Sequence, residues 1–316
     1  MKKIAYITSS SFSGSTLLSF LMNMHPNIFT IGEMDGWNYG PNESFLCSCG
    51  ETLESCPFFT SVNEHFLSNN IKFDFRNFNT SFSLSNNAFI ARLLGKEMPF
   101  WINSSLLEKT RDKIVNLIPY YNKAIKSKLS ANDVFIKAAF EYSGCDVFVD
   151  ACKDPFRLRY LKNVPMLDLE VIYLVRDFRG FILSCKKNKG WNWRTSLNIW
   201  IRQQKTILRI LDESLPYIKI HYEDIINSTD ETLASIYSFI GVQDNGFTGD
   251  FRSVEHHVLG NDMRLKQSGQ IQKNERWKKE LPINELQEAN NYAERFIKKN
   301  PMHPLSSIMS RYINEK

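Results

Sequence analysis

The sequence has no long hydrophobic run, few glycines and prolines, and no strong excess of one charge. No apolar run approaches the roughly 18 residues that a membrane span needs, so we expect no membrane-spanning segment. Only 14 glycines and 11 prolines in 316 residues exclude a collagen-like chain. Six cysteines in a chain of this length do not form a disulfide framework. The net charge of +5 is below the strongly basic signature of nucleic-acid-binding proteins, so we expect no nucleic-acid partner.

Apolar and aromatic residues are abundant enough for a large core. The chain is 43% hydrophobic and contains 23 Phe, 12 Tyr and 6 Trp, which excludes disorder as its main state. Lys2 and Lys3 precede an apolar run that stops at Ile7, and no cleavage site follows a long apolar region. We therefore interpret the N-terminal segment as mature structure and expect a cytoplasmic protein. The mildly basic charge suits one pocket for an anion.

Short apolar segments have the pattern of strands, at 4–8, 27–31, 146–150, 169–175 and 217–221. The fourth, LEVIYLV, is almost continuously apolar, which is typical of a strand buried on both faces. Segments with helical spacing lie between them, at 15–24, 155–161, 180–187 and 194–213. Ser228 with Glu231 predicts a capping box for a helix that ends at Gly241. This alternation predicts an α/β fold with a doubly wound, mainly parallel sheet flanked by helices.

The segment between the second and third predicted strands is different in composition. A cysteine-bearing loop at about 45–58 is followed by Asn/Ser-rich sequence with helical stretches near 88–94 and 106–128. We predict a single domain over 1–316 with a helical insertion at about 59–145.

The cysteines of this loop leave several interpretations open. Cys47, Cys49 and Cys56 have a C-x-C-x6-C spacing that could ligate a metal. No fourth ligand stands at a standard spacing, although His65 is conceivable; a disulfide and plain packing are the alternatives. We interpret the adjacent histidines 256–257 as polar loop residues rather than catalytic ones.

Polar side chains fall where the predicted strands end. The residues at or just after these ends are Thr8, Glu33, Lys153, Arg176 and Tyr222. The carboxyl ends of parallel strands meet at one edge of a sheet, where ligands bind. The sequence therefore predicts an acid, two cations and a phenol at one place.

The segment SSSFSGST (9–16) predicts an anion-binding loop, because backbone N–H groups and the helix dipole favour an anion where a helix begins. It is not a Walker A loop, since Ser9 replaces the first glycine and Ser15 replaces the lysine. ATP or GTP hydrolysis is therefore disfavoured, and a 5′-phosphate that carries a sulfuryl group fits better. Arg176 at a strand end and Ser184 in the next helix predict a second phosphate site.

At these motifs the sequence resembles the sulfotransferases that use PAPS (3′-phosphoadenosine-5′-phosphosulfate). SFSGSTLL is similar to their 5′-phosphosulfate loop, and LVRDFRGFILS is similar to their 3′-phosphate motif. Further similar segments follow in family order: IGE (31–33), CKDPF (152–156), HYED (221–224), GNDMR (260–264) and QKNERW (272–277). The CSCG…CPF loop is similar to that of a bacterial branch. The resemblance implies the P-loop NTPase-like sulfotransferase fold, PAPS as co-substrate, PAP as product and no required metal.

The resemblance also implies roles for the matching residues. Glu33 stands at the position of the catalytic base in tyrosylprotein-type members, and Lys153 at that of a lysine near the transferred sulfuryl group. The loop residues assigned to the nucleotide are Ser11, Phe12, Ser13, Gly14, Ser15 and Thr16. The residues assigned to the 3′-phosphate and to closure over the nucleotide are Arg176, Ser184, Tyr222, Arg264, Lys273 and Arg276.

One position departs from the family pattern. Phe12 stands where Arg, Lys or sometimes His contacts the transferring group, so one expected cation is missing. We predict a sulfotransferase that moves a sulfuryl group from PAPS to an acceptor hydroxyl by in-line attack, with Glu33 as base. The alternatives are a P-loop-like kinase or nucleotide hydrolase, and a catalytically impaired PAP-binding protein. The acceptor (small molecule, carbohydrate or phenol) and a homodimer are left open.

Overall fold

The computed structural model describes residues 2–35, 46–85, 87–95, 105–164, 168–212, 215–244, 246, 256–258 and 275–314. One sheet has the strand order β2-β3-β1-β4-β5, and every pairing within it is parallel. Its strands are β1 (Lys3–Ser9), β2 (Ile28–Thr30), β3 (Val147–Lys153), β4 (Asp168–Val175) and β5 (Tyr217–His221). Each expected strand is therefore present within a few residues of its predicted bounds.

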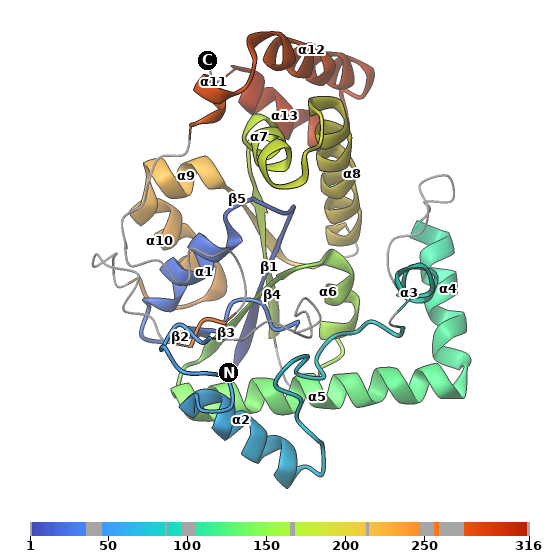
Figure 1. The fold of residues 1–316 in the computed structure, drawn as a ribbon, viewed down its shortest axis with the longest axis vertical. Helices are drawn as coiled ribbons and strands as arrows, with labels where there is room; N and C mark the ends of the chain where they lie inside the picture. Colours follow the sequence, from blue (N-terminus) through green and yellow to red (C-terminus); the bar gives the residue numbers. More distant parts are fainter. Residues whose placement is uncertain are drawn as a thin grey trace.

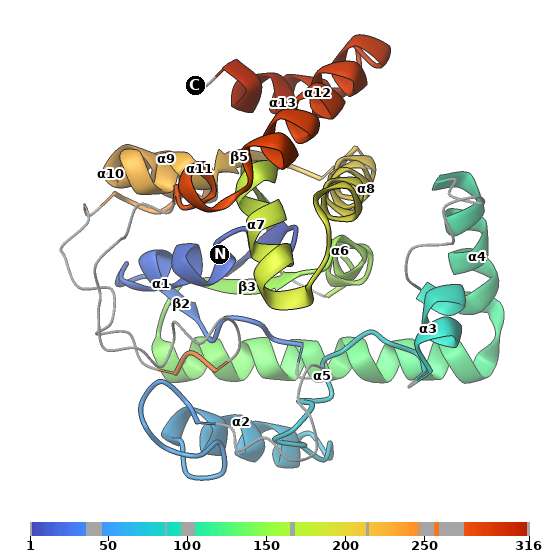
Figure 2. The same cartoon turned by 45° about the horizontal axis from the view of Figure 1, so that its top comes forward.

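Helices cover both faces of the sheet (Figures 1 and 2). One face carries α1 (Ser15–Asn23), α9 (Tyr222–Asn227) and α10 (Thr229–Ile240). The other carries α6 (Pro155–Leu161), α7 (Phe178–Lys189) and α8 (Trp193–Leu211). The predicted α/β fold with a parallel sheet flanked by helices is confirmed. The predicted capping box is wrong, because Ser228 makes no side-chain capping bond to α10.

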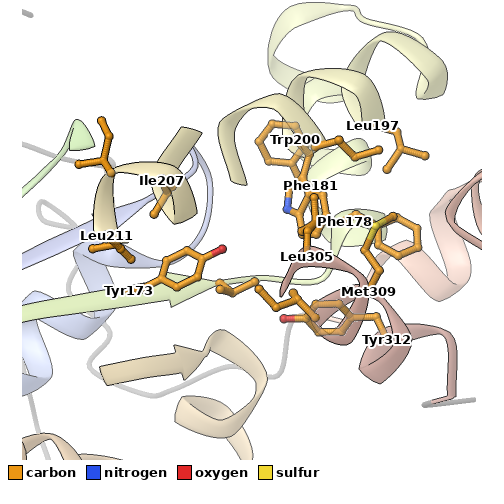
Figure 3. Packing of buried hydrophobic residues seen from close by; sticks show 14 of the residues in the cluster. Tyr173, Phe178, Phe181, Leu197, Trp200, Ile207, Leu211, Leu305, Met309 and Tyr312 are labelled. Carbon is orange, nitrogen blue, oxygen red and sulfur yellow. The ribbon is translucent and has the colours of Figure 1, made fainter. Parts of the chain in front are cut away.

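Alternating side chains of the central strand β1 supply the cores on both faces of the sheet. Ala5 and Ile7 of β1 pack with α1 and α10, whereas Tyr6 packs with α6 to α8. Figure 3 shows the second core, where Tyr173 of β4 meets side chains from α7, α8 and the C-terminal helix. Trp200 of α8 donates its indole N–H to the carbonyl of Arg176 at 3.2 Å. The core thereby fixes the end of β4.

The chain between β2 and β3 forms four described helices, α2 (Pro57–Ser68), α3 (Ala88–Gly95), α4 (Ser105–Leu117) and α5 (Pro119–Ser143). The expected helical stretch 106–128 is two helices, because Pro119 suits the first turn of a helix and not its interior. The long α5 runs along the β2–β3 edge with α2 packed on it, and α3 and α4 stand away from the sheet (Figures 1 and 2).

Three C-terminal helices were not expected from the sequence. They are α11 (Trp277–Glu280), α12 (Ile283–Lys299) and α13 (Pro304–Asn314). Leu305, Met309 and Tyr312 of α13 complete the core between β4, α7 and α8 (Figure 3). Among the described helices, none combines the length and the apolarity needed to cross a bilayer.

Candidate active site

The loop between β1 and α1 turns sharply where the chain leaves the sheet. Gly14, which precedes the first turn of α1, has a φ of 89°, and a Cβ there would lie 2.3 Å from the ring of Tyr222. Glycine is therefore required by both backbone conformation and space. Phe12 also has a left-handed φ of 59°, which is uncommon for a residue with a side chain. Such backbone strain is concentrated at functional sites.

Hydroxyl groups and backbone donors gather around this loop. Ser13 and Ser15 are buried, and the Ser13 hydroxyl lies 2.6 Å from that of Ser10. The hydroxyl of Ser9 is buried and has no hydrogen-bond partner among the residues that the structure describes. The N-cap residue of α1 is Gly14, which has no side chain to cap the helix, and the first turn of α1 holds no acidic residue. An anion would satisfy these donors and the positive end of the helix dipole.

The acid and the lysine predicted from the sequence lie together. Glu33 follows β2, Lys153 ends β3, and their side chains form an ion pair. The hydroxyl of Thr8 donates to the Lys153 carbonyl at 2.9 Å, which connects the end of β3 to the start of the anion loop. Lys153 has a φ of 68°, a second strained residue at this edge. The side chains of Glu33 and Lys153 are 12% and 26% exposed, so both groups can reach a bound molecule.

Arg176 joins the anion loop to the next strand. Its Nη1 donates to the carbonyl of Phe12 at 2.6 Å, and its guanidinium lies 4.7 Å from the centre of the Tyr222 ring. A Cβ at Gly180 would lie 3.1 Å from Arg176 Nε, so a small residue there leaves room for the guanidinium. Ser184, one turn further along α7, donates its hydroxyl to the Gly180 carbonyl at 2.9 Å. Arg176 is therefore held between the loop, the phenol ring and α7.

The other residues that are predicted to bind the nucleotide differ in their exposure to solvent. Thr16 is buried in the first turn of α1, whereas Ser11 and Arg276 are exposed. Burial raises the pKa of Tyr222, and the nearby guanidinium groups of Arg176 and Arg276 oppose that rise. Residues 264 and 273, the predicted Arg264 and Lys273, lie outside the described residues.

A hollow of about 350 Å³, which includes space open to solvent, is lined in part by residues that closely follow Glu33 and Lys153 in the sequence. These residues are Asp35, two positions after Glu33, and Asp154, one position after Lys153. The rings of Phe82 and Tyr160 stack at 4.7 Å on its wall, and Ala91 of α3 lies on the wall too. The sequence did not indicate Phe82, Ala91 or Tyr160, because they come from segments without a motif.

A buried arginine supports this wall. Arg157 Nε donates to Asp150 at 2.8 Å, and its Nη1 donates to the Thr80 carbonyl at 2.8 Å. Its Nη2 donates to Asn132 of α5 at 2.5 Å. These charge-assisted bonds connect α6, β3 and α5. The signal for this network in the sequence is Asp150, a charged residue that follows three apolar residues of β3.

Comparisons with known proteins find similarity only at the level of structure. No family model matches the sequence, and no curated protein matches it. The sulfotransferase domain from the Synechococcus PCC 7002 olefin synthase is 17% identical with a TM-score of 0.48, over 93% of this chain and 96% of that one. The sulfotransferase domain from the curacin biosynthetic pathway is 17% identical with a TM-score of 0.46, over 93% and 98%. Sulfotransferase STF9 from Mycobacterium avium is 11% identical with a TM-score of 0.40, over 77% and 64%. At such values the function must be argued from the residues of the site.

The structure corrects the interpretation of the cysteine-bearing loop. All six cysteines are free, so the disulfide alternative is wrong. His65 does not approach the cysteines, since its two ring nitrogens lie 2.9 Å from the Ser61 carbonyl and 2.8 Å from Glu141. The histidine beside the cysteines is His256, which is buried and not a polar loop residue. No spacing rule could have found it, because it lies 200 residues from Cys56.

Proposed function

We propose that this protein transfers a sulfuryl group from PAPS to a hydroxyl-bearing acceptor. The observation that carries the proposal is the partly exposed Glu33–Lys153 ion pair at the sheet edge that also holds the anion loop. It brings a proton acceptor and a cation to one place, and Asp35 and Asp154, which are close to them in the sequence, line a partly open hollow. Those are the groups that a transfer to a hydroxyl needs.

The proposed nucleotide site has two parts. The loop residues Ser13 to Thr16 hold the 5′-phosphosulfate through backbone N–H groups and hydroxyls, and Ser11 and Phe12 form the outer part of the loop. Arg176 and Ser184 hold the 3′-phosphate, with Tyr222 and Arg276 beside them. A loop with serine in place of the Walker lysine supplies mostly neutral donors. Such a loop suits the single charge of a sulfuryl group better than the higher charge of a terminal phosphate.

The proposed reaction is an in-line displacement at sulfur. Glu33 accepts the proton of the acceptor hydroxyl as its oxygen bonds to sulfur, and the bond between sulfur and the 5′-phosphate oxygen breaks. Lys153 and the loop N–H groups stabilise the charge that develops on that leaving oxygen. The products are a sulfated acceptor and PAP, and the released proton is on Glu33.

We place the acceptor in the hollow that Asp35 and Asp154 help to line. The stacked rings of Phe82 and Tyr160 offer an apolar surface, and Ser81 and Asp35 add hydrogen-bonding groups on the same lining. A small molecule that combines a flat apolar part with hydroxyls, such as a phenol or a carbohydrate, matches this lining. Half of the lining residues come from the 59–145 segment, so that segment contributes to the selection of the acceptor.

A second candidate function follows from Phe12. Its ring packs 6.3 Å from that of Phe181, and its carbonyl binds Arg176, so this residue supports the nucleotide side of the site. It adds no cation to the sulfuryl group. A PAP-binding protein with impaired catalysis would show the same arrangement.

An acceptor screen with PAPS tests both functions. Phenols, sugars and simple alcohols would be incubated with PAPS and the protein, with and without Mg²⁺. PAP release and the sulfated product would be followed by mass spectrometry. We expect acceptor-dependent PAP release that Mg²⁺ does not change. Tight PAP binding without turnover on any acceptor would favour the impaired protein, and absence of PAP binding would contradict both.

A further inference from the structure

Three cysteines and a histidine from distant segments meet beside β2. Cys47 and Cys49 lie in a turn, and Cys56 directly precedes the first residue of α2. His256 comes from the short described segment 256–258, drawn in orange near β2 and α5 in Figures 1 and 2. The four potential ligand atoms all lie within 4.8 Å of one another, and three of the four residues are buried.

Three of the distances between these atoms are close to the edges of a tetrahedron around one ion. Zn–S bonds of about 2.3 Å and Zn–N bonds of about 2.0 Å give edges of about 3.8 Å between sulfurs and about 3.5 Å from sulfur to nitrogen. The Sγ atoms of Cys49 and Cys56 are 3.8 Å apart. His256 Nδ1 lies 3.2 Å from Cys56 Sγ and 3.8 Å from Cys47 Sγ. A disulfide would need its sulfurs about 2.05 Å apart.

The histidine is oriented as a metal ligand. The hydroxyl of Tyr142 on α5 lies 2.9 Å from His256 Nε2, so the outer nitrogen has a partner and Nδ1 faces the sulfurs. An outer hydrogen bond of this kind fixes the ring and the tautomer of ligating histidines. His256 also has a left-handed φ of 67°, a strained conformation that ligand binding would offset.

We propose that Cys47, Cys49, Cys56 and His256 bind one structural Zn²⁺ ion. Three sulfurs and one imidazole nitrogen are a ligand set typical of zinc, and four protein ligands leave no open position for a substrate. On binding, the three thiols release their protons to solvent and the imidazole binds through its neutral nitrogen. No electron is transferred. The ion therefore takes no part in the sulfuryl transfer proposed above, and the proposal does not depend on it.

The site connects the cysteine-bearing loop to the sheet edge. Ser48 N–H donates to the His257 carbonyl at 3.0 Å, and His257 N–H donates to the Ser48 hydroxyl at 2.8 Å. Val258 N–H donates to the carbonyl of Ile31 at 2.9 Å, two residues before the proposed base. A zinc ion would thus hold segments 46–56 and 256–258 together and support the chain that carries Glu33.

Metal analysis of the purified full chain tests the site. Inductively coupled plasma mass spectrometry should find about one zinc ion per chain in the wild type. Cys49→Ser and His256→Gln should lose most of it. The matched controls His65→Gln and Cys185→Ser should keep it, since His65 contacts Glu141 and Cys185 is buried in the core between α7 and α8. Wild-type protein that binds no zinc after reconstitution, or variants that bind as much as the wild type, would overturn the proposal.

A second measurement uses the wild type alone and is therefore independent of whether the variants fold. Protein stripped of metal by a chelator would be titrated with Co²⁺. Three thiolates and an imidazole around Co²⁺ should give the strong visible bands of a tetrahedral complex and a sulfur-to-metal charge-transfer band, and Zn²⁺ should remove both. Absence of these bands, or a Cys49–Cys56 disulfide found by peptide mapping without reductant, would contradict the site. Neither readout depends on activity with PAPS.

Discussion

The two polar sites of this molecule are built in opposite ways. The anion loop is one continuous segment with strained backbone at Phe12, a buried hydroxyl at Ser9 and a glycine instead of a capping side chain at the helix start. The cysteine–histidine cluster joins segments 200 residues apart, and its four side chains face one another. The first arrangement leaves donors for a ligand that comes and goes, and the second encloses an ion. The comparison teaches that an exchange site keeps polar groups without partners for its ligand, whereas a structural site turns its ligand atoms toward one another.

The largest effect should come from removing the proposed base at the open site. Glu33→Gln keeps the size of the side chain but cannot accept the proton, so turnover should fall by about 10²–10⁴. PAP affinity, measured by calorimetry, should stay within a few-fold, because Glu33 contacts Lys153 and not the proposed phosphate sites. Glu54→Gln, an exposed carboxylate of the cysteine-bearing loop, is the control. Turnover close to that of the wild type would exclude Glu33 as the base.

The next largest effect should come from the lysine of the same pair. Lys153→Ala should lower turnover by about 10²–10³, which is typical of one lost transition-state donor. Lys162→Ala, an exposed residue at the end of α6, should change nothing. Phe12→Arg in the Lys153→Ala background should recover part of the rate if position 12 reaches the sulfuryl group. Full activity of Lys153→Ala, followed by PAP release, would show that the assignment is wrong.

A smaller effect is expected at the second anion site. Arg176→Ala removes a guanidinium that contacts the loop and Tyr222, and a charge-assisted bond is worth about 1.5–3 kcal/mol. PAP affinity should therefore fall about tenfold to a hundredfold, measured by calorimetry and by the loss of PAP-induced thermal stabilisation. Arg295→Ala on α12 is an exposed control. Unchanged affinity in Arg176→Ala would remove the argument for two phosphate sites.

The difference between the two sites also decides what could be read from the sequence. All strands were predicted because their apolar runs are local, and the approach of Glu33 to Lys153 followed from the common edge of parallel strands. His256 was missed because its partners are distant in sequence, and Arg157 because three separate segments satisfy it. The helices α12 and α13 were not predicted, and they carry no motif of the family that the sequence resembles. Pro119 marks the break between α4 and α5 in the sequence, but the predicted helical stretch 106–128 ran across it.

The last predicted effect is on the stability of the fold rather than on turnover or binding, and it concerns the buried carboxyl of Glu223. Burial and the nearby Asp177 carboxylate raise the pKa of Glu223 to about 7, from 4.5, although it accepts bonds from Asp177 N–H at 3.1 Å and the Tyr312 hydroxyl at 3.2 Å. A carboxyl whose pKa is higher in the folded state stabilises the fold below about pH 4.5, and this stability is lost as the pH rises through about 7.

Glu223→Gln cannot ionise, so its stability relative to the wild type should increase between pH 5 and pH 8, by an amount on the order of 2 kcal/mol. Urea unfolding at the two pH values measures the difference. Asp177 and His221 are present in both proteins, so the comparison reports the Glu223 carboxyl together with its interaction with Asp177. Glu231→Gln, an exposed carboxyl of α10, is the control. If the difference in unfolding free energy between the variant and the wild type is the same at pH 5 and pH 8, the Glu223 carboxyl does not titrate with a raised pKa. Its burial would then not destabilise the fold at high pH.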